Sequence, residues 1–356
     1  MLGVPDSLLK YFGSYAFDHG NDLIAANEGG ALAIASGYHL ASGKIPLIYL
    51  QNSGFGNIVN PLTSLVDKEV YSIPVMIMVG WRGRPGVKDE PQHTKPGKTQ
   101  EKQLEALGLP YSILSTNEEE AESQISKAFE IMRERSAPFV VLVPPKTFAE
   151  YSFKGEAEGN KYSLKREEAL EELIRKLTDN DIVVSTTGKT SRELFELRKK
   201  YDQGHHRDFL TVGSMGHASQ IALGIALEKR DRSVFCIDGD GALIMHMGSL
   251  AIIGEQQPAN FRHILINNGA HESVGGQPTA AFKIDIGKIA EACGYKKTFR
   301  VTDLDSLNKC FDEFIHSEGP VLLEVMTKTG ARADLGRPTL SPIENKENFM
   351  RFLSKD

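Results

Sequence analysis

The sequence has few cysteines, no excess of positive charge and no long apolar run. Only three of its 356 residues are cysteine, and Cys236, Cys293 and Cys310 are too widely spaced for a disulfide framework or a zinc-binding pattern. A net charge of −6 gives no basic footprint for nucleic acid. No apolar run is long enough to span a membrane, and the first residues lack the basic region and apolar core of a signal peptide. We therefore expect a protein of the reducing cytoplasm, without nucleic-acid or membrane partners.

The length is sufficient for two α/β domains, each with its own core. Apolar strands alternate with helical segments over residues 1–150 and again over residues 166–356, and a polar stretch at 151–165 reads as a linker. Strands are predicted at 21–26, 45–50, 75–79, 139–143, 182–185, 209–212, 234–237, 263–266 and 321–325, and a short helix at 345–353 in the tail. The sequence thus predicts two doubly wound, parallel-sheet domains with no domain between them.

Two of these strands end in residues suited to a metal ion and a phosphate group. Residues 234–237 lead into Gly239-Asp240-Gly241-Ala242, and residues 263–266 lead into Asn267-Asn268-Gly269-Ala270. Glycines beside Asp240 let a bulky anion approach the backbone, and the helix that follows offers unpaired N–H groups. Asp240 and Asn268 are hard oxygen ligands of the kind that Mg²⁺ accepts together with phosphate oxygens. The residues predict a Mg²⁺–diphosphate site at the carboxyl edge of a parallel sheet.

The two segments together, at this spacing, resemble the thiamine diphosphate (TPP) motif of TPP-dependent enzymes. The alternative is that each is an ordinary turn at a strand end. The resemblance implies that Asp240, Asn268 and the backbone carbonyl of Ala270 hold Mg²⁺, while Gly239, Gly241 and Ala242 lie against the cofactor.

Two further turns are candidates for binding the cofactor. Thr187, Gly188, Lys189 and Thr190 follow a strand and open a helix, so their N–H groups and hydroxyls can meet phosphate, although an ordinary capped strand–helix turn would look the same. Gly213, Ser214 and Met215 follow the next strand. In the TPP family a glycine here accepts a hydrogen bond from the aminopyrimidine, and an apolar residue two positions later supports the bent cofactor; Met215 as core filler is the alternative.

The catalytic candidate is Glu28. It stands with Asn27 and Gly29 at the start of a helix after an early strand, as does the glutamate that hydrogen-bonds the pyrimidine ring in TPP enzymes. The alternative is structural, because Asn27 is a good N-cap and a glutamate in the first turn is stabilised by the helix dipole.

The loop predicted at residues 80–98 carries Arg82, Lys88 and His93. These side chains suit a second anionic group on a small substrate, through charge-assisted hydrogen bonds. A solvated loop of mixed charge is the alternative, since Asp89 and Glu90 interrupt the cations.

Four segments give a narrower resemblance, to phosphonopyruvate decarboxylases, with sulfopyruvate decarboxylases as the nearest relatives. The segments are residues 3–9 (GVPDSLL), 52–54 (NSG), 80–93 (GWRGRPGVKDEPQH) and 330–338 (GARADLGRP). The resemblance covers nearly the whole chain, and because members usually carry a further helix and strand before the first segment, this chain is expected to begin inside that element.

This resemblance implies a TPP- and Mg²⁺-dependent carboxy-lyase that converts 3-phosphonopyruvate into phosphonoacetaldehyde and CO₂. Glu28 would activate the cofactor, and Arg82, Lys88 and His93 would bind the 2-oxo acid. The family builds each active site between two subunits, so a homo-oligomer is expected. Sulfopyruvate decarboxylation, a carboligating transferase of the acetolactate synthase type and a TPP-binding protein without turnover are the alternatives.

Overall fold

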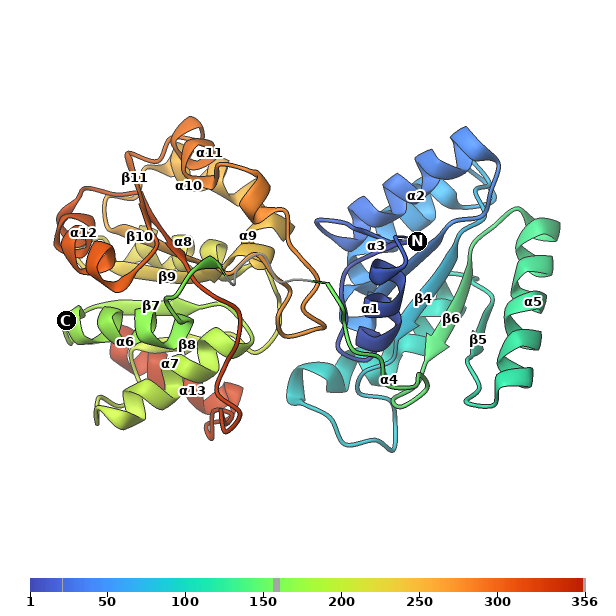
Figure 1. Ribbon diagram of the computed structural model, residues 1–356, viewed down its shortest axis with the longest axis horizontal. Helices are drawn as coiled ribbons and strands as arrows, with labels where there is room; N and C mark the ends of the chain where they lie inside the picture. The colour runs from blue at the N-terminus through green and yellow to red at the C-terminus, as the bar shows by residue number, and fades with distance from the viewer. Residues whose placement is uncertain (21, 156–160, 355–356) are drawn as a thin grey trace. The chain divides into compact units, whose positions relative to one another are not determined.

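The computed structural model describes residues 1–20, 22–155 and 161–354. They form two compact units (Figure 1). The first comprises the described residues of Met1–Glu156 together with Ser273–Gln277, and the second those of Ala157–Glu272 and Pro278–Asp356. The centre of the predicted linker 151–165, residues 156–160, lies outside the described residues. Within the described ranges no helix is both long and apolar enough to cross a membrane.

The first unit is built on a parallel sheet with the strand order β2-β1-β3-β4-β6-β5. Its strands are β1 (Leu2–Gly3), β2 (Leu23–Ile24), β3 (Leu47–Gln51), β4 (Met76–Gly80), β5 (Tyr111–Ile113) and β6 (Phe139–Val143). Its helices are α1 (Lys10–Asp18), α2 (Glu28–Ser42), α3 (Phe55–Pro61), α4 (Pro91–Ala106) and α5 (Glu118–Arg135), with short turns η1 (Asn52–Gly54) and η2 (Leu62–Val66).

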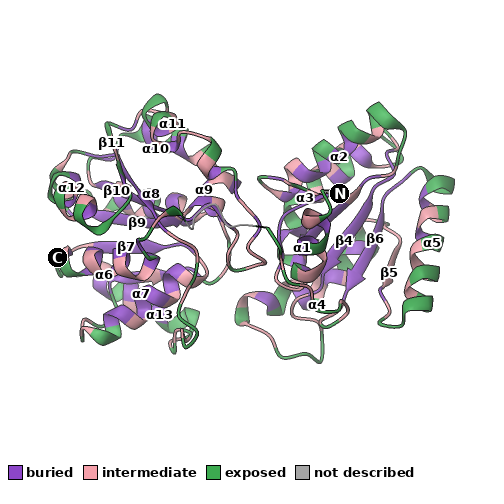
Figure 2. Ribbon diagram, in the orientation of Figure 1, coloured by how far each residue is buried: buried purple, intermediate pink, exposed green. Residues whose placement is uncertain are grey.

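Helices cover both faces of this sheet because alternate side chains of each strand point to opposite sides. Ile48 and Leu50 of β3 pack with α2, α3 and α4, whereas Tyr49 packs with α5 and the start of α1. The central strands β4 and β6 are buried along their whole length (Figure 2), as expected for parallel strands covered on both faces.

The second unit repeats this architecture with the strand order β11-β12-β10-β9-β7-β8. Its strands are β7 (Ile182–Ser185), β8 (Asp208–Leu210), β9 (Val234–Gly239), β10 (Phe261–Asn267), β11 (Lys297–Val301) and β12 (Val321–Met326). Its helices are α6 (Arg166–Lys176), α7 (Lys189–Lys200), α8 (Ala218–Glu228), α9 (Asp240–Met245), α10 (Ser249–Gln256), α11 (Ile286–Ala292), α12 (Leu304–His316) and α13 (Pro342–Leu353), with the turn η4 (Ala281–Lys283). Helices α6, α7 and α12 cover one face, and α8, α10, α11 and α13 the other.

The predicted fold class, two doubly wound parallel sheets, is confirmed. One local prediction was wrong, and two strands were missed. The loop predicted at 80–98 ends at Glu90, because Pro91 occupies the first turn of α4, where its missing N–H costs nothing. Strands β5 and β11 were missed because they lie at sheet edges and are only partly buried, which removes the apolar signal.

Candidate functional site

In doubly wound sheets, ligands bind at the carboxyl ends of two neighbouring strands whose connections run to opposite sides. In the second unit this point lies between β7 and β9, because β8 lies on one side of β7 and β9 on the other. The loop after β7 and the loop after β9 are therefore neighbours, and the backbone N–H of Thr186 donates to the carbonyl of Ile237 at 2.8 Å. The topology alone brings the predicted phosphate turn next to the predicted metal-binding turn.

Asp240 is the first residue of α9 and is buried. Its carboxylate accepts a hydrogen bond from the Thr279 hydroxyl at 2.5 Å and further bonds from backbone N–H groups, including that of Gly269. Burial nevertheless raises the pKa of Asp240 to about 6. Among the described residues no lysine, arginine or histidine forms an ion pair with Asp240. A buried carboxylate of this kind fits a site that receives its positive charge from a metal ion.

Asn268 lies directly after β10, also buried, and its loop contacts Asp240 through Gly269. The side-chain Oδ1 accepts from the N–H of Ala270 at 3.1 Å, and Nδ2 donates to Glu272 at 2.9 Å. Ala270 is held by a bridge to Pro278. The structure thus brings together the three predicted metal ligands, Asp240, Asn268 and Ala270, in one set of adjoining turns.

Gly241 follows Asp240 and has a specific steric role. A Cβ at this position would lie 2.9 Å from Cε1 and 3.0 Å from Nδ1 of the His271 ring, which is closer than real Cβ contacts. Burial lowers the pKa of His271 to about 4, so the imidazole is neutral at pH 7. The second glycine of the motif is therefore required by the packing of His271.

Residues Thr187 to Thr190 form the turn and first helical residues between β7 and α7. Gly188 has a φ of +100°, and Thr190 is buried. The side chain of Lys189 forms an ion pair, in which Nζ donates to Glu272 at 2.7 Å. Glu272 also accepts from Arg166, and both cations lower the pKa of Glu272.

The turn at residues 213–217, after β8, packs against α9. Ser214 has a φ of +53°, and its hydroxyl lies 3.0 Å from Nδ1 of His217. A Cβ on Gly216 would come within 2.9 Å of the Ala242 carbonyl oxygen. The predicted cofactor residues Gly213, Ser214 and Met215 therefore lie on a turn that contacts the helix beginning with Asp240.

Glu28 is the first residue of α2, in the first unit. Asn27 caps the helix by accepting from the N–H of Gly30 at 2.9 Å, as predicted. The carboxylate of Glu28 is buried and accepts from Asn57 Nδ2 at 2.8 Å. Burial raises the pKa of Glu28. The carboxylate lies directly over Gly54, where any Cβ would overlap it. Such a carboxyl, protonated more readily than a solvated one, suits proton exchange with a ring nitrogen.

The residues predicted to bind substrate lie in the same unit. Arg82, after β4, donates to both carboxylate oxygens of Asp89 and to the Ser7 hydroxyl. Lys88 is exposed in the loop. His93 was placed in a loop but lies in the first turn of α4 and is buried. The Arg82–Asp89 pair fixes the loop and holds the pKa of Asp89 far below its ordinary value.

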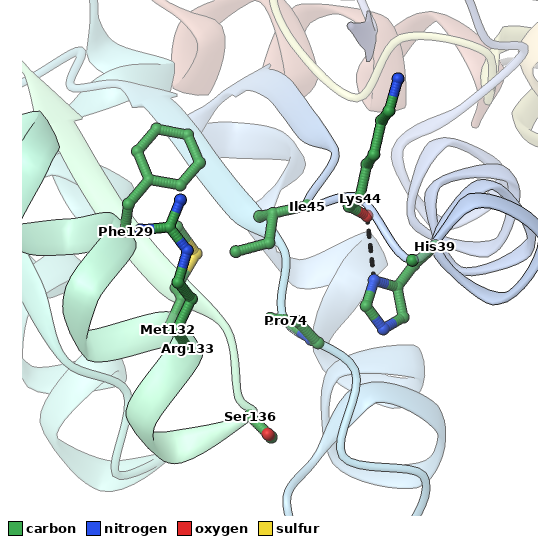
Figure 3. Close-up of a pocket in the computed structure, with 9 residues that line it drawn as sticks. His39, Lys44, Ile45, Pro74, Phe129, Met132, Arg133 and Ser136 are labelled. Carbon is green, nitrogen blue, oxygen red and sulfur yellow. Dashed lines mark hydrogen bonds between the residues drawn. The ribbon is translucent and has the colours of Figure 1, made fainter.

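A hollow of about 440 Å³ in the first unit is not this site (Figure 3). It is lined by His39, Gly43, Lys44, Ile45, Pro74, Phe129, Met132, Arg133 and Ser136. Ile45, Pro74 and Ser136 precede β3, β4 and β6, so the hollow lies at the amino edge of the sheet, opposite to the turn that carries Glu28. None of its lining residues is a predicted site residue.

Sequence reasoning missed Glu272, Thr279 and the contact of Gly54 with Glu28. Glu272 stood in a stretch after the predicted metal loop for which the resemblance gave no clear match. Thr279 lies far along the chain from Asp240, and only the bridge between Ala270 and Pro278 brings it back. The Asn-Ser-Gly segment at 52–54 did carry a signal, since it belongs to the resemblance with decarboxylases, but the signal did not reveal the partner of the glycine.

Two models of one protein family match this chain. The family described as thiamine pyrophosphate enzyme, N-terminal TPP binding domain, matches residues 1–105, and its C-terminal TPP binding domain counterpart matches residues 186–325. A solved structure from Mycobacterium smegmatis is 14% identical to this chain and superimposes with a TM-score of 0.41 over 92% of this chain and 96% of that chain.

Two curated relatives match over most of their length. The phosphonopyruvate decarboxylase of Streptomyces viridochromogenes is 35% identical over 346 residues, 93% of this chain and 85% of that protein. The sulfopyruvate decarboxylase of Methanosarcina acetivorans is 31% identical over 352 residues, 92% of this chain and 86% of that protein. The chain therefore belongs to the thiamine pyrophosphate enzyme family, in the group that contains the phosphonopyruvate and sulfopyruvate decarboxylases.

Proposed function

We propose that this chain is a TPP- and Mg²⁺-dependent carboxy-lyase that converts 3-phosphonopyruvate into phosphonoacetaldehyde and CO₂, a step of phosphonate biosynthesis. The observation that carries the proposal is the 35% identity with a phosphonopyruvate decarboxylase over 93% of the chain. The adjoining turns of Asp240 and Asn268 support it, because they present oxygen ligands at the carboxyl edge of the second sheet.

Asp240, Asn268 and the carbonyl of Ala270 would hold Mg²⁺. The raised pKa of Asp240 is the supporting observation, since a buried carboxylate without a cationic partner gains from a divalent ion. The N–H groups at the start of α7 and the turn at residues 213–217 would bind the rest of the cofactor. Met215, half-buried on the same turn, would support the cofactor.

Thiamine diphosphate, when bound, supplies the electron sink that permits loss of CO₂ from a 2-oxo acid. Glu28 would hold a proton at the pyrimidine ring of the cofactor. Its burial and the hydrogen bond from Asn57 fix the carboxyl in one position, and burial raises its pKa, so it holds that proton more readily than a solvated carboxyl does.

Arg82, Lys88 and His93 would bind the carboxylate and the second anionic group of the substrate. Arg82 is already oriented by Asp89 and Ser7, so it would act as a fixed donor, while the exposed Lys88 would supply a mobile charge. A phosphonate carries up to two negative charges and a sulfonate only one, so a cationic loop favours the phosphonate.

We further infer a homo-oligomer whose active sites are shared between subunits. Helix α2, which begins with Glu28, leaves Ile34, Tyr38 and Leu40 exposed, a large apolar surface for one helix of a free-standing protein. Light scattering on the eluting protein tests this, and a monomer at micromolar concentration would contradict it.

The test of function is CO₂ release by the pure protein with TPP and Mg²⁺, given phosphonopyruvate, sulfopyruvate or pyruvate. We expect the highest kcat/KM with phosphonopyruvate. A preference for sulfopyruvate would keep the reaction and replace the substrate. Formation of acetolactate from pyruvate, without preference for either anionic substrate, would contradict the assignment as a lyase.

A further inference from the structure

We propose that Glu272 is a positioning residue, which orients the amide of Asn268 toward the metal ion and holds Lys189 at the diphosphate turn. This inference rests on the proposed function, because it assumes that Asn268 is a ligand of Mg²⁺ in a TPP site. Nothing in the comparisons assigns a role to Glu272.

Glu272 collects four hydrogen bonds from four separate segments of the second unit. Its Oε2 accepts from Arg166 Nη1 at 2.8 Å and from Asn268 Nδ2 at 2.9 Å. Its Oε1 accepts from Lys189 Nζ at 2.7 Å and from the N–H of Gly330 at 3.0 Å. These four bonds match the acceptor capacity of an ionised carboxylate.

The hydrogen bond from Asn268 to Glu272 fixes the orientation of the Asn268 side-chain amide. A carboxylate only accepts, so the group that faces Glu272 must be the NH₂ of Asn268, and the oxygen must face the opposite side. There the oxygen lies by the N–H of Ala270, within the turn that contacts Asp240. The reversed amide would present NH₂ to the metal ion and could not bind it. Glu272 therefore selects the orientation in which Asn268 is a ligand.

The ion pair of Arg166 and Glu193 holds Glu272 in place. Arg166, buried at the start of α6, makes two hydrogen bonds to Glu193 and directs a third nitrogen to Glu272. The side chain of Glu272 is only 12% exposed. The Arg166–Glu193 pair thus forms a rigid base for the carboxylate that contacts the metal ligand.

The same carboxylate holds two more elements at the turn. Lys189, the first residue of α7, is kept against the metal loop at the helix end that would meet the diphosphate. The N–H of Gly330 links the C-terminal segment to Glu272, and Arg332 in the same segment donates to Glu167 on α6. The two cations Arg166 and Lys189 are balanced by Glu193 and Glu272, so the cluster carries no net charge before the cofactor arrives.

The experiment measures cofactor binding and needs no substrate. TPP is titrated calorimetrically into wild type and Glu272→Gln at a series of Mg²⁺ concentrations, which gives the apparent Kd for Mg²⁺. Because supporting residues behind metal ligands commonly change affinity by about 10–100-fold, we expect a rise of at least tenfold for Glu272→Gln. The matched control is Glu255→Gln, an exposed carboxylate on α10, which should leave the Kd unchanged.

A second background separates orientation from general support. In Asn268→Asp either side-chain oxygen can be a ligand, so orientation no longer matters. The new carboxylate oxygen would also face Glu272 Oε2 at the 2.9 Å that now separates this atom from Asn268 Nδ2, so adding Glu272→Gln removes a like-charge repulsion and should cost no Mg²⁺ affinity. The orienting role would be refuted if Glu272→Gln lowered the Mg²⁺ affinity equally in the wild-type and Asn268→Asp backgrounds. It would also be refuted if Glu272→Gln alone bound Mg²⁺ as tightly as the wild type.

Three further outcomes are informative. If circular dichroism shows that Glu272→Gln does not fold, Glu272→Asp takes its place, because it retains the charge with a shorter reach. Glu272→Asp should lose Mg²⁺ affinity to a smaller extent, and an unchanged affinity would refute the proposal. If the wild type binds no TPP in the presence of Mg²⁺, both this inference and the proposed function are wrong. If the wild type binds TPP but releases no CO₂, only the proposed function is wrong.

Discussion

Removing the charge of Asp240 should stabilise the protein without cofactor while abolishing its response to cofactor. Burial raises the pKa of this carboxyl from its ordinary 3.8 to about 6. A shift of roughly 2 units corresponds to ~3 kcal/mol of lost folding free energy once the group is ionised. The variant Asp240→Asn has no charge to bury, but its amide nitrogen cannot accept the hydrogen bonds that Thr279 and the backbone donate, each worth about 1 kcal/mol. We therefore expect a net gain of about 1–2 kcal/mol at pH 7.5.

The sign of the pH dependence follows from the direction of the shift. The folded protein holds the proton of Asp240 up to about pH 6, whereas the unfolded chain releases it near 3.8. The contribution of Asp240 to wild-type stability is thus highest below pH 3.8, falls as the pH rises through that window, and levels off above about pH 6. The variant lacks this fall, so its advantage should widen by about 2 kcal/mol between pH 4 and pH 7.5.

Urea unfolding followed by circular dichroism measures both quantities. Trp81, the single tryptophan, lies in the first unit, so its fluorescence provides an internal reference that the substitution should leave unchanged. Adding Mg²⁺ and TPP at a hundred times their Kd should stabilise the wild type by about 2.7 kcal/mol and the variant by nothing. A stability difference that does not change with pH would refute the reasoning on burial, and equal stabilisation by cofactor would refute Asp240 as the metal ligand.

Three further predictions concern the first unit. Glu28→Gln should lower kcat by about 10²–10⁴-fold while calorimetric TPP affinity changes only a few-fold; wild-type turnover would remove Glu28 from catalysis. Gly54→Ala places a methyl group on the Glu28 carboxylate and should lower kcat at least tenfold, whereas Gly56→Ala, two residues on with open space beside it, should not. Arg82→Lys loses the paired hydrogen bonds to Asp89 and should raise the KM for the 2-oxo acid at least fivefold with a smaller change in kcat, in contrast to Arg84→Lys; equal KM values for both variants would contradict a role of Arg82 in binding.

Long, strongly patterned elements could be read from the sequence. Helix α2 ends at Ser42 because Gly43, a residue typical of helix ends, adopts the left-handed conformation that stops it. The buried strands β4, β6, β7 and β9 were found because an unbroken apolar run is typical of a parallel strand covered on both faces. Helix α4 was missed over its first eight residues, which the predicted loop at 80–98 includes. Pro91 marks the start of the helix, but Pro96 and several polar residues conceal its continuation.

The sequence by itself determined the two α/β units, the TPP-type motif around Asp240 and Asn268, and the candidate acid Glu28. These are local properties, since turn residues and strand patterns act within a few positions of the chain. Only the tertiary structure decided that Thr279 returns to Asp240, that Gly54 lies under Glu28, and that Glu272 joins Arg166, Lys189, Asn268 and Gly330. Such contacts arise from strand order at the carboxyl edge of each sheet, which brings together residues distant in the chain, and no local pattern records them.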